Sequence, residues 1–454
     1  MSLATDSAAA GRQEWLLCPD GLDLREALPV GQAKRLDTAR RVVHHITLRS
    51  LGRSRADRWT PVSAALGETL AGSRRAWDAV RAALIGAGVL EVDGRDPARG
   101  KRGHYLPGVA SLRYRLDGRL AAAPLRPEKT KCALREGEIA AAARDVLRRA
   151  SGRWLPIHDR LEGWLRQFSV DAAAVERVLA GIKDPVKRRH AERIAIALTY
   201  GSEFDRAGIV CEYGRFHSIV TRTPRELRST LRIGGEPLCE IDVSNCQPLV
   251  LGLEASAEFE RKRSNESEAK AGKQEGERDG EREGLLRRPG PLSLCCTFSH
   301  DCVDRSDVSE FVDICSAGRF YEELADVLSM PFRTASQRRA VKLESMRVIF
   351  GKHRPTWPRW AAFADRWPGV ASHLAGLKRD DHRHAAHVLQ RAESRLMIEL
   401  ACGDMMQRHP DIGILTVHDS ILTPMGGLVP AFTAVTGAWR GAGAVPKLKV
   451  KRPG

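Results

Sequence analysis

The sequence predicts an α+β protein in which a few short apolar strands are combined with long helical segments. Two stretches with strand composition, 238–243 and 414–423, lie far apart in the chain and are each bounded by polar turn residues. Elsewhere, residues 126–204, 311–328, 336–350 and 384–407 carry apolar side chains at helical spacing. This mixture of the two periodicities is typical of the α+β class.

The chain carries a large positive charge. Its 454 residues have a formal net charge of +16, which favours a polyanionic partner, most commonly nucleic acid. An arginine-rich composition without a special partner is the alternative. The N-terminal segment lacks the apolar core of a signal peptide, and no apolar run reaches membrane-spanning length. We therefore expect a cytoplasmic, monomeric protein with reduced cysteines and no membrane partner.

Residues 238–253, LCEIDVSNCQPLVLGL, predict a strand that ends near Asp242 and is followed at once by a helix. Ser244 or Asn245 suits the N-cap, and Pro248 suits the first turn, where a missing N–H costs nothing. This arrangement presents the carboxylate of Asp242 at a strand end, where a metal ion or substrate can reach it. The alternative is an ordinary carboxylate at a helix entry.

Residues 414–423, ILTVHDSILT, predict a β-hairpin with Asp419 in its turn. Aspartate is common in such turns for backbone reasons alone, which is the alternative interpretation. If the strands of Asp242 and Asp419 are neighbours, however, two like charges come together, and cations between them would relieve the repulsion. A two-metal phosphoryl-transfer site has this composition.

Residues 336–353 predict a helix that ends at Gly351. Arg338, Lys342, Met346 and Phe350 recur every four residues and therefore share one face. The two cations suit a triphosphate, and the apolar end suits a base or sugar. A surface helix with a basic stripe is the alternative.

Taken in order, these three stretches resemble motifs A, B and C of the family A nucleic-acid polymerases, which include bacterial repair-type DNA polymerases and single-subunit phage RNA polymerases. The helix resembles the pattern R-x3-K-x7-[YF]-G. The resemblance covers roughly residues 205–425, about half of the chain. It implies two Mg²⁺ ions, with Mn²⁺ as a substitute, on Asp242 and Asp419.

The same resemblance implies roles for other residues. Lys342 is implied to act in catalysis and, with Arg338, Met346, Phe350 and Gln247, to bind the nucleotide. The segment YGRFHS at 213–218 is similar to a family segment whose arginine contacts the primer-template, here Arg215. Gln390 and His418 are implied to contact the primer-template as well.

The sequence departs from the family's DNA polymerases at several positions. Gln247 stands where they carry glutamate, near the incoming sugar, and His418-Asp419 is followed by serine, as in the RNA polymerases. Met346 and Phe350 replace the usual aromatic residue and tyrosine. These changes leave the metal ligands in place and leave the choice between deoxyribonucleotides and ribonucleotides open.

The implied architecture is a right-hand polymerase with an antiparallel palm sheet and helical fingers and thumb, preceded by a winged-helix-like domain. In that domain, Thr60-Pro61 suits a helix start, and residues 73–87 suit a recognition helix that carries Arg74 and Arg75 towards DNA. Residues from Arg95 to Arg102 suit the wing. A helical domain that merely packs on its neighbour is the alternative.

The expected segments are a flexible arm (1–38), the winged-helix-like domain (39–125), a thumb-like helical region (126–225), a first palm part (226–330) with a disordered insertion (255–290), fingers (331–375) and a second palm part (376–454).

The sequence thus predicts a template-dependent DNA polymerase, a nucleotidyltransferase that uses nucleoside triphosphates to extend a DNA primer-template. An RNA polymerase or primase of the same fold is one alternative. A winged-helix DNA-binding relative that no longer catalyses is the other.

Overall fold

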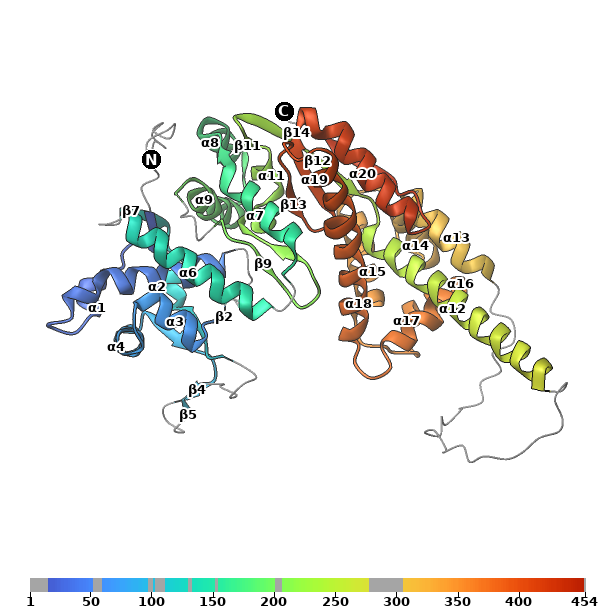
Figure 1. The fold of residues 1–454 in the computed structure, drawn as a ribbon, viewed down its shortest axis with the longest axis horizontal. Coiled ribbons are helices and arrows are strands. Elements are labelled where there is room, and N and C mark those ends of the chain that lie inside the picture. The colour runs from blue at the N-terminus through green and yellow to red at the C-terminus, as the bar shows by residue number, and fades with distance from the viewer. Residues whose placement is uncertain are drawn as a thin grey trace. The chain divides into compact units, whose positions relative to one another are not determined.

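The computed structural model describes residues 15–51, 59–96, 101–102, 111–129, 133–151, 154–200, 206–276 and 305–452. It confirms a helix-rich α+β protein (Figure 1). The chain divides into two compact units. The first comprises residues 1–241, 398–434 and 450–454, and the second comprises residues 242–397 and 435–449.

The first unit opens with ordered elements where the sequence predicted a flexible arm over 1–38. Strand β1 pairs antiparallel with β7, and Leu17 and Cys18 in β1 are fully buried. The backbone N–H of Leu17 donates to His44 Nδ1 at 2.8 Å, which ties β1 to the next helix. Residues 1–14 of the expected arm lie outside the described residues. The elements are β1 (Trp15–Pro19), α1 (Leu24–Ala27), the 3₁₀ turn η1 (Ala33–Arg35), α2 (Leu36–Ser50) and β7 (Leu125–Lys129).

Helices α3 and α4 and a three-stranded antiparallel sheet follow; the strand order in this sheet is β2-β6-β3. Thr60-Pro61 forms strand β2 rather than the predicted helix start, because the N-cap is Ser63, whose side chain accepts from Leu66 N. Trp77 fills the core; a Cβ on Gly67 would lie 2.4 Å from its ring, so only glycine fits there. The elements are β2 (Thr60–Pro61), α3 (Ala64–Ala71), α4 (Arg74–Gly86), β3 (Leu90–Val92), the paired β4 (Arg95–Asp96) and β5 (Lys101–Arg102), and β6 (Arg113–Leu116).

Most of the described residues between 126 and 204 are helical, as the sequence predicted. Glu162 is buried on α7, where Arg148 and Arg166 each lie 2.7 Å from its carboxylate. This pairing offsets the desolvation of the buried charge. The elements are α5 (Gly118–Ala122), α6 (Ala133–Ser151), α7 (Pro156–Gln167), β8 (Phe168–Val170), α8 (Ala172–Gly181), α9 (Pro185–Tyr200), β9 (Ile209–Val210), β10 (Phe216–His217) and α10 (Ile219–Arg222).

A six-stranded sheet forms the structural frame of the candidate site. Its strand order is β13-β14-β12-β11-β8, with β15 paired to β12. The C-terminal tail forms β15. The elements are α11 (Arg225–Arg228), β11 (Leu231–Ile233), β12 (Glu236–Val243), α19 (Gly403–Arg408), β13 (Leu415–Val417), β14 (Ser420–Pro424), the 3₁₀ turn η5 (Met425–Gly427), α20 (Leu428–Gly441) and β15 (Leu448–Lys451).

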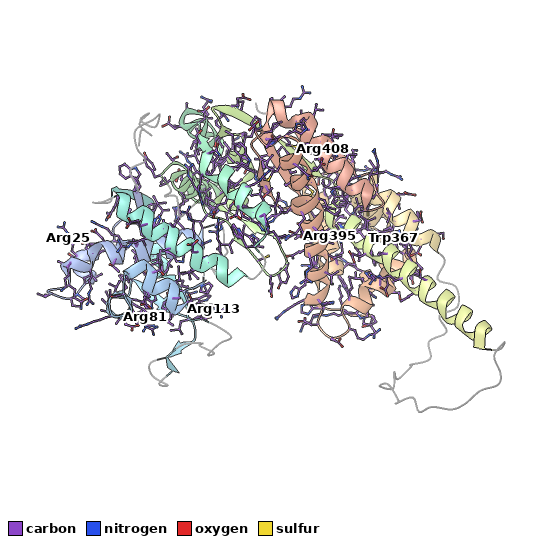
Figure 2. All side chains as sticks on the ribbon, in the orientation of Figure 1. Arg25, Arg81, Arg113, Trp367, Arg395 and Arg408 are labelled. Carbon is purple, nitrogen blue, oxygen red and sulfur yellow. The ribbon has the colours of Figure 1, made fainter. Side chains whose placement is uncertain are left out.

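The second unit is helical around an aromatic core. The ring of Trp367, labelled in Figure 2, is fully buried and lies 5.2 Å from that of Phe311 and 5.3 Å from that of Phe363. The elements are α12 (Cys246–Gly276), α13 (Arg305–Ser316), α14 (Phe320–Val327), α15 (Ala335–Phe350), α16 (Pro358–Arg366), α17 (Pro368–Leu377), α18 (Arg383–Ser394) and the π-helical segment η4 (Arg395–Cys402).

Helix α12 extends through part of the segment where the sequence predicted a disordered insertion, 255–290. Residues 255–276 are helical, and Glu258 pairs with Arg261 at 3.1 Å and with Lys262 at 3.7 Å. Pairs at these spacings, in a sequence rich in helix-forming residues, stabilise this part of α12. Residues 277–290 lie outside the described residues. Among the helices that the structure describes, none is both long and apolar enough to cross a bilayer.

Candidate active site

The strand that carries Asp242 is held at its centre by buried polar contacts. Glu240 and Asp242 stand two residues apart on β12 and therefore face the same side of the sheet. Glu240 is buried, and both Arg228 and Lys451 contact its carboxylate at 2.8 Å. Burial would raise the pKa of Glu240, but the hydrogen bond from Lys451 and the charge of Arg228 hold it below its usual value. Asp242 itself is half-buried.

The chain turns sharply after Asp242. Asn245 has a φ of 53°, in the left-handed region that asparagine tolerates better than most residues, and α12 begins at the next residue. The backbone N–H of Leu249 donates to the carbonyl of Asn245 at 2.9 Å, as expected of a cap. The predicted order of strand, cap and helix is therefore confirmed, with Pro248 in the first turn.

The sequence also predicted the hairpin around Asp419. Strands β13 and β14 pair antiparallel with Val417 opposite Ser420, so His418 and Asp419 form the two-residue turn. His418 has a φ of 52°, as such a tight turn requires. Asp419 is half-buried.

The sheet joins the strand of Asp242 to the hairpin of Asp419. Strands β12 and β14 are hydrogen-bonded neighbours. In addition, the thiol of Cys239 on β12 donates to the carbonyl of Thr423 on β14 at 3.1 Å. From this contact, β12 continues three residues to Asp242, and β14 leads back four residues to Asp419. The strand of Asp242 and the hairpin of Asp419 are therefore neighbours in the sheet. The predicted pairing of the two aspartates depended on this condition.

Two of the predicted primer-template residues, Arg215 and His418, lie within electrostatic reach of each other. Arg215 lies between β9 and β10, which form a short antiparallel pair, and is half-buried. Burial, which is the largest cause, and the charges of Arg215 and Arg228 together lower the pKa of His418 to about 4. His418 is therefore neutral at physiological pH. The ring of His217 lies 5.8 Å from that of His418, a neighbour that the sequence did not identify.

The predicted nucleotide-binding face lies on α15. Thr334 and Gln337 form a capping box at its start, and Gly351 ends it, where a Cβ would lie 2.4 Å from the carbonyl oxygen of Arg347. The buried residues of the helix are Val341, Glu344, Ser345, Val348 and Ile349. On the predicted face, the two cations are exposed and the two apolar residues are half-buried: Arg338, Lys342, Met346 and Phe350.

Each cation of this face lies over an aromatic ring. The guanidinium of Arg338 lies 5.4 Å from the ring centre of Phe332, and the ammonium of Lys342 lies 6.0 Å from that of Tyr321, on α14. Such contacts hold a long side chain in place without neutralising its charge. Tyr321 belongs to no motif of the sequence, because its ring reaches α15 from another helix.

Gln247 is paired with a residue that the sequence did not single out. Its side-chain amide donates to the carboxylate of Glu393 on α18, and the thiol of Cys246 lies 3.7 Å from the same oxygen. Glu393 is 2% exposed. The predicted primer-template residue Gln390 is half-buried one turn earlier on α18.

The other two predicted nucleic-acid-binding residues, Arg74 and Arg75, lie on α4 in the first unit. Both are exposed. Arg74 pairs with Asp78 at 3.0 Å, and Arg81, labelled in Figure 2, pairs with the same carboxylate at 3.1 Å. Arg75 has no ion-pair partner within the described part of the chain. This end of α4 therefore keeps a net positive charge.

Within the described residues, no group of three or more histidine, cysteine, aspartate or glutamate side chains is arranged to hold a metal ion. The predicted pair, Asp242 and Asp419, is smaller than such a group. Two carboxylates are a donor set of the kind that Mg²⁺ uses, because this ion takes one or two carboxylates and completes its shell with water and substrate phosphates. The donor set excludes a closed structural zinc site.

No protein-family model matches the sequence, and no curated protein matches it. Among solved structures, the polymerase domain of Pol1 from M. smegmatis, in complex with DNA primer-template and dNTP, is similar with a TM-score of 0.35 and 14% identity. The similarity covers 62% of this chain and 55% of that chain, so this chain spans about half of that structure. A similarity of this size assigns neither a family nor a function.

Proposed function

We propose that the protein is a template-dependent DNA polymerase of right-hand architecture, which extends a primer 3′ end. The observation that carries the proposal is the strand order β13-β14-β12, because it makes the strand of Asp242 a neighbour of the hairpin of Asp419. Two carboxylates at adjoining strand ends are the protein part of a two-metal phosphoryl-transfer site. The proposed enzyme is a cytoplasmic monomer.

In this proposal, Asp242 and Asp419 hold two Mg²⁺ ions, or Mn²⁺ in their place. When bound, the ions would lower the pKa of the primer hydroxyl and neutralise the triphosphate. In this role, the two aspartates direct their four carboxylate oxygens towards a common metal site. The contacts of Glu240 with Arg228 and Lys451 help to orient Asp242, because they hold β12 in place two residues before it.

The face of α15 supplies the positive charge and the apolar surface that a nucleotide needs. Arg338 and Lys342 neutralise phosphate oxygens, and Lys342 delivers a proton to the leaving pyrophosphate. The rings of Phe332 and Tyr321 limit the motion of these side chains, so less entropy is lost when the phosphates bind. Met346 and Phe350 support the base and sugar.

The primer-template contacts are assigned to Arg215, His418 and Gln390. Arg215 and Gln390 donate to acceptors in the minor groove, which base pairs of every sequence offer. His418 acts as a neutral group at the primer terminus, because its pKa of about 4 leaves it uncharged at pH 7. Helices α6–α9 take the thumb position.

Primer extension tests the proposal. Wild-type protein, Mg²⁺, a primed DNA template and one nucleoside triphosphate at a time should give extension only with the nucleotide that complements the template. Changing the next template base should change the required nucleotide. Extension that ignores the template, or no extension in either Mg²⁺ or Mn²⁺, contradicts the proposal.

A second candidate function is duplex-DNA binding by the winged-helix-like domain proposed for residues 39–125. The specific observation in its support is the element order: helices α2, α3 and α4, the three-stranded sheet β2-β6-β3 and the β4–β5 pair between β3 and β6. In such a domain α4 is the recognition helix, and Arg74 and Arg75 lie at its N-terminal end. This function requires no metal.

Duplex binding measured without divalent ions tests this second function. Arg75→Ala should weaken binding by about three- to tenfold and lower the salt slope by about one. Arg25→Ala is the matched control, because Arg25 is an exposed arginine on α1, apart from α4 in the chain (Figure 2). Equal losses in both variants would indicate nonspecific attraction by charge and contradict a recognition role for α4.

A further inference from the structure

The proposed winged-helix-like domain and the helix α6 that follows it share one hydrophobic core. This core contains side chains of α2, α3, α4, β3 and β6, and it also contains Ala140 and Ala143 of α6. Helices α3 and α6 pack against each other (Figure 1). Two domains joined by a flexible linker would each have a core of their own. Helix α6 is therefore fixed to the domain that carries Arg74 and Arg75.

The C-terminal part of α6 holds the segment that carries Arg215. Arg148 on α6 pairs with the buried carboxylate of Glu162 at 2.7 Å, and the other oxygen of this carboxylate accepts from the backbone N–H of Gly208 at 3.3 Å. Gly208 directly precedes β9, which packs against α6. Strand β9 pairs with β10, and in the turn between them the backbone N–H of Cys211 donates to the carbonyl of Arg215 at 3.1 Å. Helix α6 thus connects the core around α4 to the turn of Arg215.

A second connection joins α2 to the hairpin of Asp419. The guanidinium of Arg222 on α10 donates to the carbonyl of Leu48, in the last turn of α2, at 2.7 Å. Helix α10 also packs against β13, which leads directly into His418 and Asp419. Both connections lie within the first unit. They hold the exposed arginines of α4 at a fixed spacing from Arg215 and His418.

This spacing suits a single piece of duplex DNA. Arg148 lies eight residues after Ala140, which is about 12 Å along a helix axis. Helix α4 packs on α3, and α3 packs on α6; each of these packing steps adds about 8–10 Å. The path from α4 to the contact with Glu162 is therefore about 30 Å, the rise of about nine base pairs of B-DNA. A duplex of about one helical turn is long enough to reach from the turn of Arg215 to α4.

We infer that the duplex arm of the primer-template, held by Arg215 and His418 near the primer 3′ end, extends to α4, where Arg74 and Arg75 contact it. One DNA molecule then occupies both sites. Two contacts on a rigid frame bind one ligand more tightly than either contact alone, but only when the ligand is long enough to reach both. The winged-helix-like domain therefore selects primer-templates whose duplex arm exceeds about one helical turn. The inference rests on the proposed polymerase function and on duplex binding by this domain.

The first test measures the KM of wild-type protein for primer-templates whose duplex arm ranges from about 5 to about 30 base pairs. All of them share the same primer 3′ end and the same single-stranded template. The KM should fall about tenfold or more as the arm passes a length near one helical turn, and it should stay constant for longer arms. A KM that is the same for all arms, or that falls gradually without a step, overturns the inference and leaves the polymerase proposal standing.

The second test asks whether one DNA molecule fills both sites. A separate blunt duplex with blocked 3′ ends is added to the primer-template with the shortest arm. This duplex can occupy the site on α4 but cannot connect it to the primer end, so the KM for the short primer-template should not fall. A lower KM would show that the two sites bind different DNA molecules, which contradicts the inference.

The third test uses variants and the same series of arms. Arg75→Ala should raise the KM for long arms about three- to tenfold and thereby reduce the step. Arg25→Ala, at an exposed arginine of α1, is the matched control and should keep the step. Equal losses in both variants, or a loss in Arg75→Ala that is the same for short and long arms, would indicate general attraction by charge and overturn the inference. If wild-type protein extends no primer of any length, the proposed polymerase function fails instead.

Discussion

Burial of the His418 imidazole, reinforced by the positive charge of Arg215, lowers the pKa of His418 to about 4. The two residues lie 203 positions apart in the chain, and both were expected to contact the primer-template. Their proximity places a permanent cation next to a histidine that stays neutral. A neutral ring at this position does not compete with Arg215 for a phosphate or a minor-groove acceptor.

This relationship predicts how stability depends on pH. In the unfolded chain, histidine has a pKa near 6.5, so between pH 6.5 and 4 the unfolded state binds a proton that folded His418 does not. The free energy of unfolding should therefore be fully retained above pH 6.5 and fall as pH is lowered towards 4. The contribution of His418 should be about 1–2 kcal/mol after allowance for partial exposure.

Urea denaturation at pH 7 and pH 5 measures this effect. His418→Gln should reduce the difference in unfolding free energy between the two pH values. His158, whose pKa burial also lowers to about 4, should keep part of the difference in that variant. His409→Gln, at an exposed histidine, is the control and should retain the wild-type difference. An unchanged difference in His418→Gln would show that His418 does not titrate in this range.

The contact between Lys378 and the end of α15 predicts that Lys378 stabilises this helix. Its ammonium is buried beside the ring of Trp360 and donates to the carbonyl of Val348, in the last turn of α15, at 2.5 Å. Burial lowers the pKa of Lys378 to about 8. Lys378→Ala leaves this carbonyl unpaired and should lower the free energy of unfolding by about 1–3 kcal/mol. Lys352→Ala, at an exposed lysine, should change it by less than about 0.5 kcal/mol. Equal effects would contradict a capping role.

The contact between Lys342 and Tyr321 predicts an effect on nucleotide binding. Tyr321→Leu removes the ring beneath the ammonium and should raise the KM for nucleotide about two- to fivefold, as expected for an exposed cation–π contact of about 0.5–1 kcal/mol. Tyr321→Phe keeps the ring and should resemble wild type. Steady-state extension at varied nucleotide concentration measures the change. If Phe and Leu variants are equally impaired, the hydroxyl and not the ring is what matters.

The aromatic core of the second unit predicts a large loss of stability on truncation. Phe311 is fully buried against Phe320, Phe363 and Trp367. Phe311→Ala should cost about 3–5 kcal/mol, because it removes buried area and leaves a cavity. Phe432→Ala, at a position 42% exposed, should cost far less. Thermal melts followed by tryptophan fluorescence measure the loss of stability in each variant. Similar losses in Phe311→Ala and Phe432→Ala would contradict a packed core around Phe311.

Much of the local structure could be predicted because local chemistry determines it. The strand before Asp242, the hairpin turn at His418-Asp419 and the helix that ends at Gly351 depend on neighbouring caps, turn residues and periodicity. These signals lie within a few residues of each other. The helix of residues 74–86 was also predictable, because Ser73 caps its start.

The remaining features depend on contacts distant in the sequence. Thr60-Pro61 became a strand because β6 pairs with it, although a Thr-Pro pair also suits a helix start. Segment 15–38 is ordered because β1 pairs with β7, more than a hundred residues later. Residues Glu393, Tyr321 and His217 could not be assigned for the same reason, since each acts through a partner on another element.

The most direct measurement is the single-turnover rate of nucleotide incorporation by Asp242→Asn and Asp419→Asn in Mg²⁺, with Asp411→Asn, at an exposed aspartate in the same region as β13, as the control. Each of the first two variants removes a charge that the metal pair requires, so both should lose at least about a hundred- to a thousandfold in rate while melting like wild type. The control should keep the wild-type rate. Wild-type rates in both Asp242→Asn and Asp419→Asn would contradict the assignment of a two-metal site to these strands.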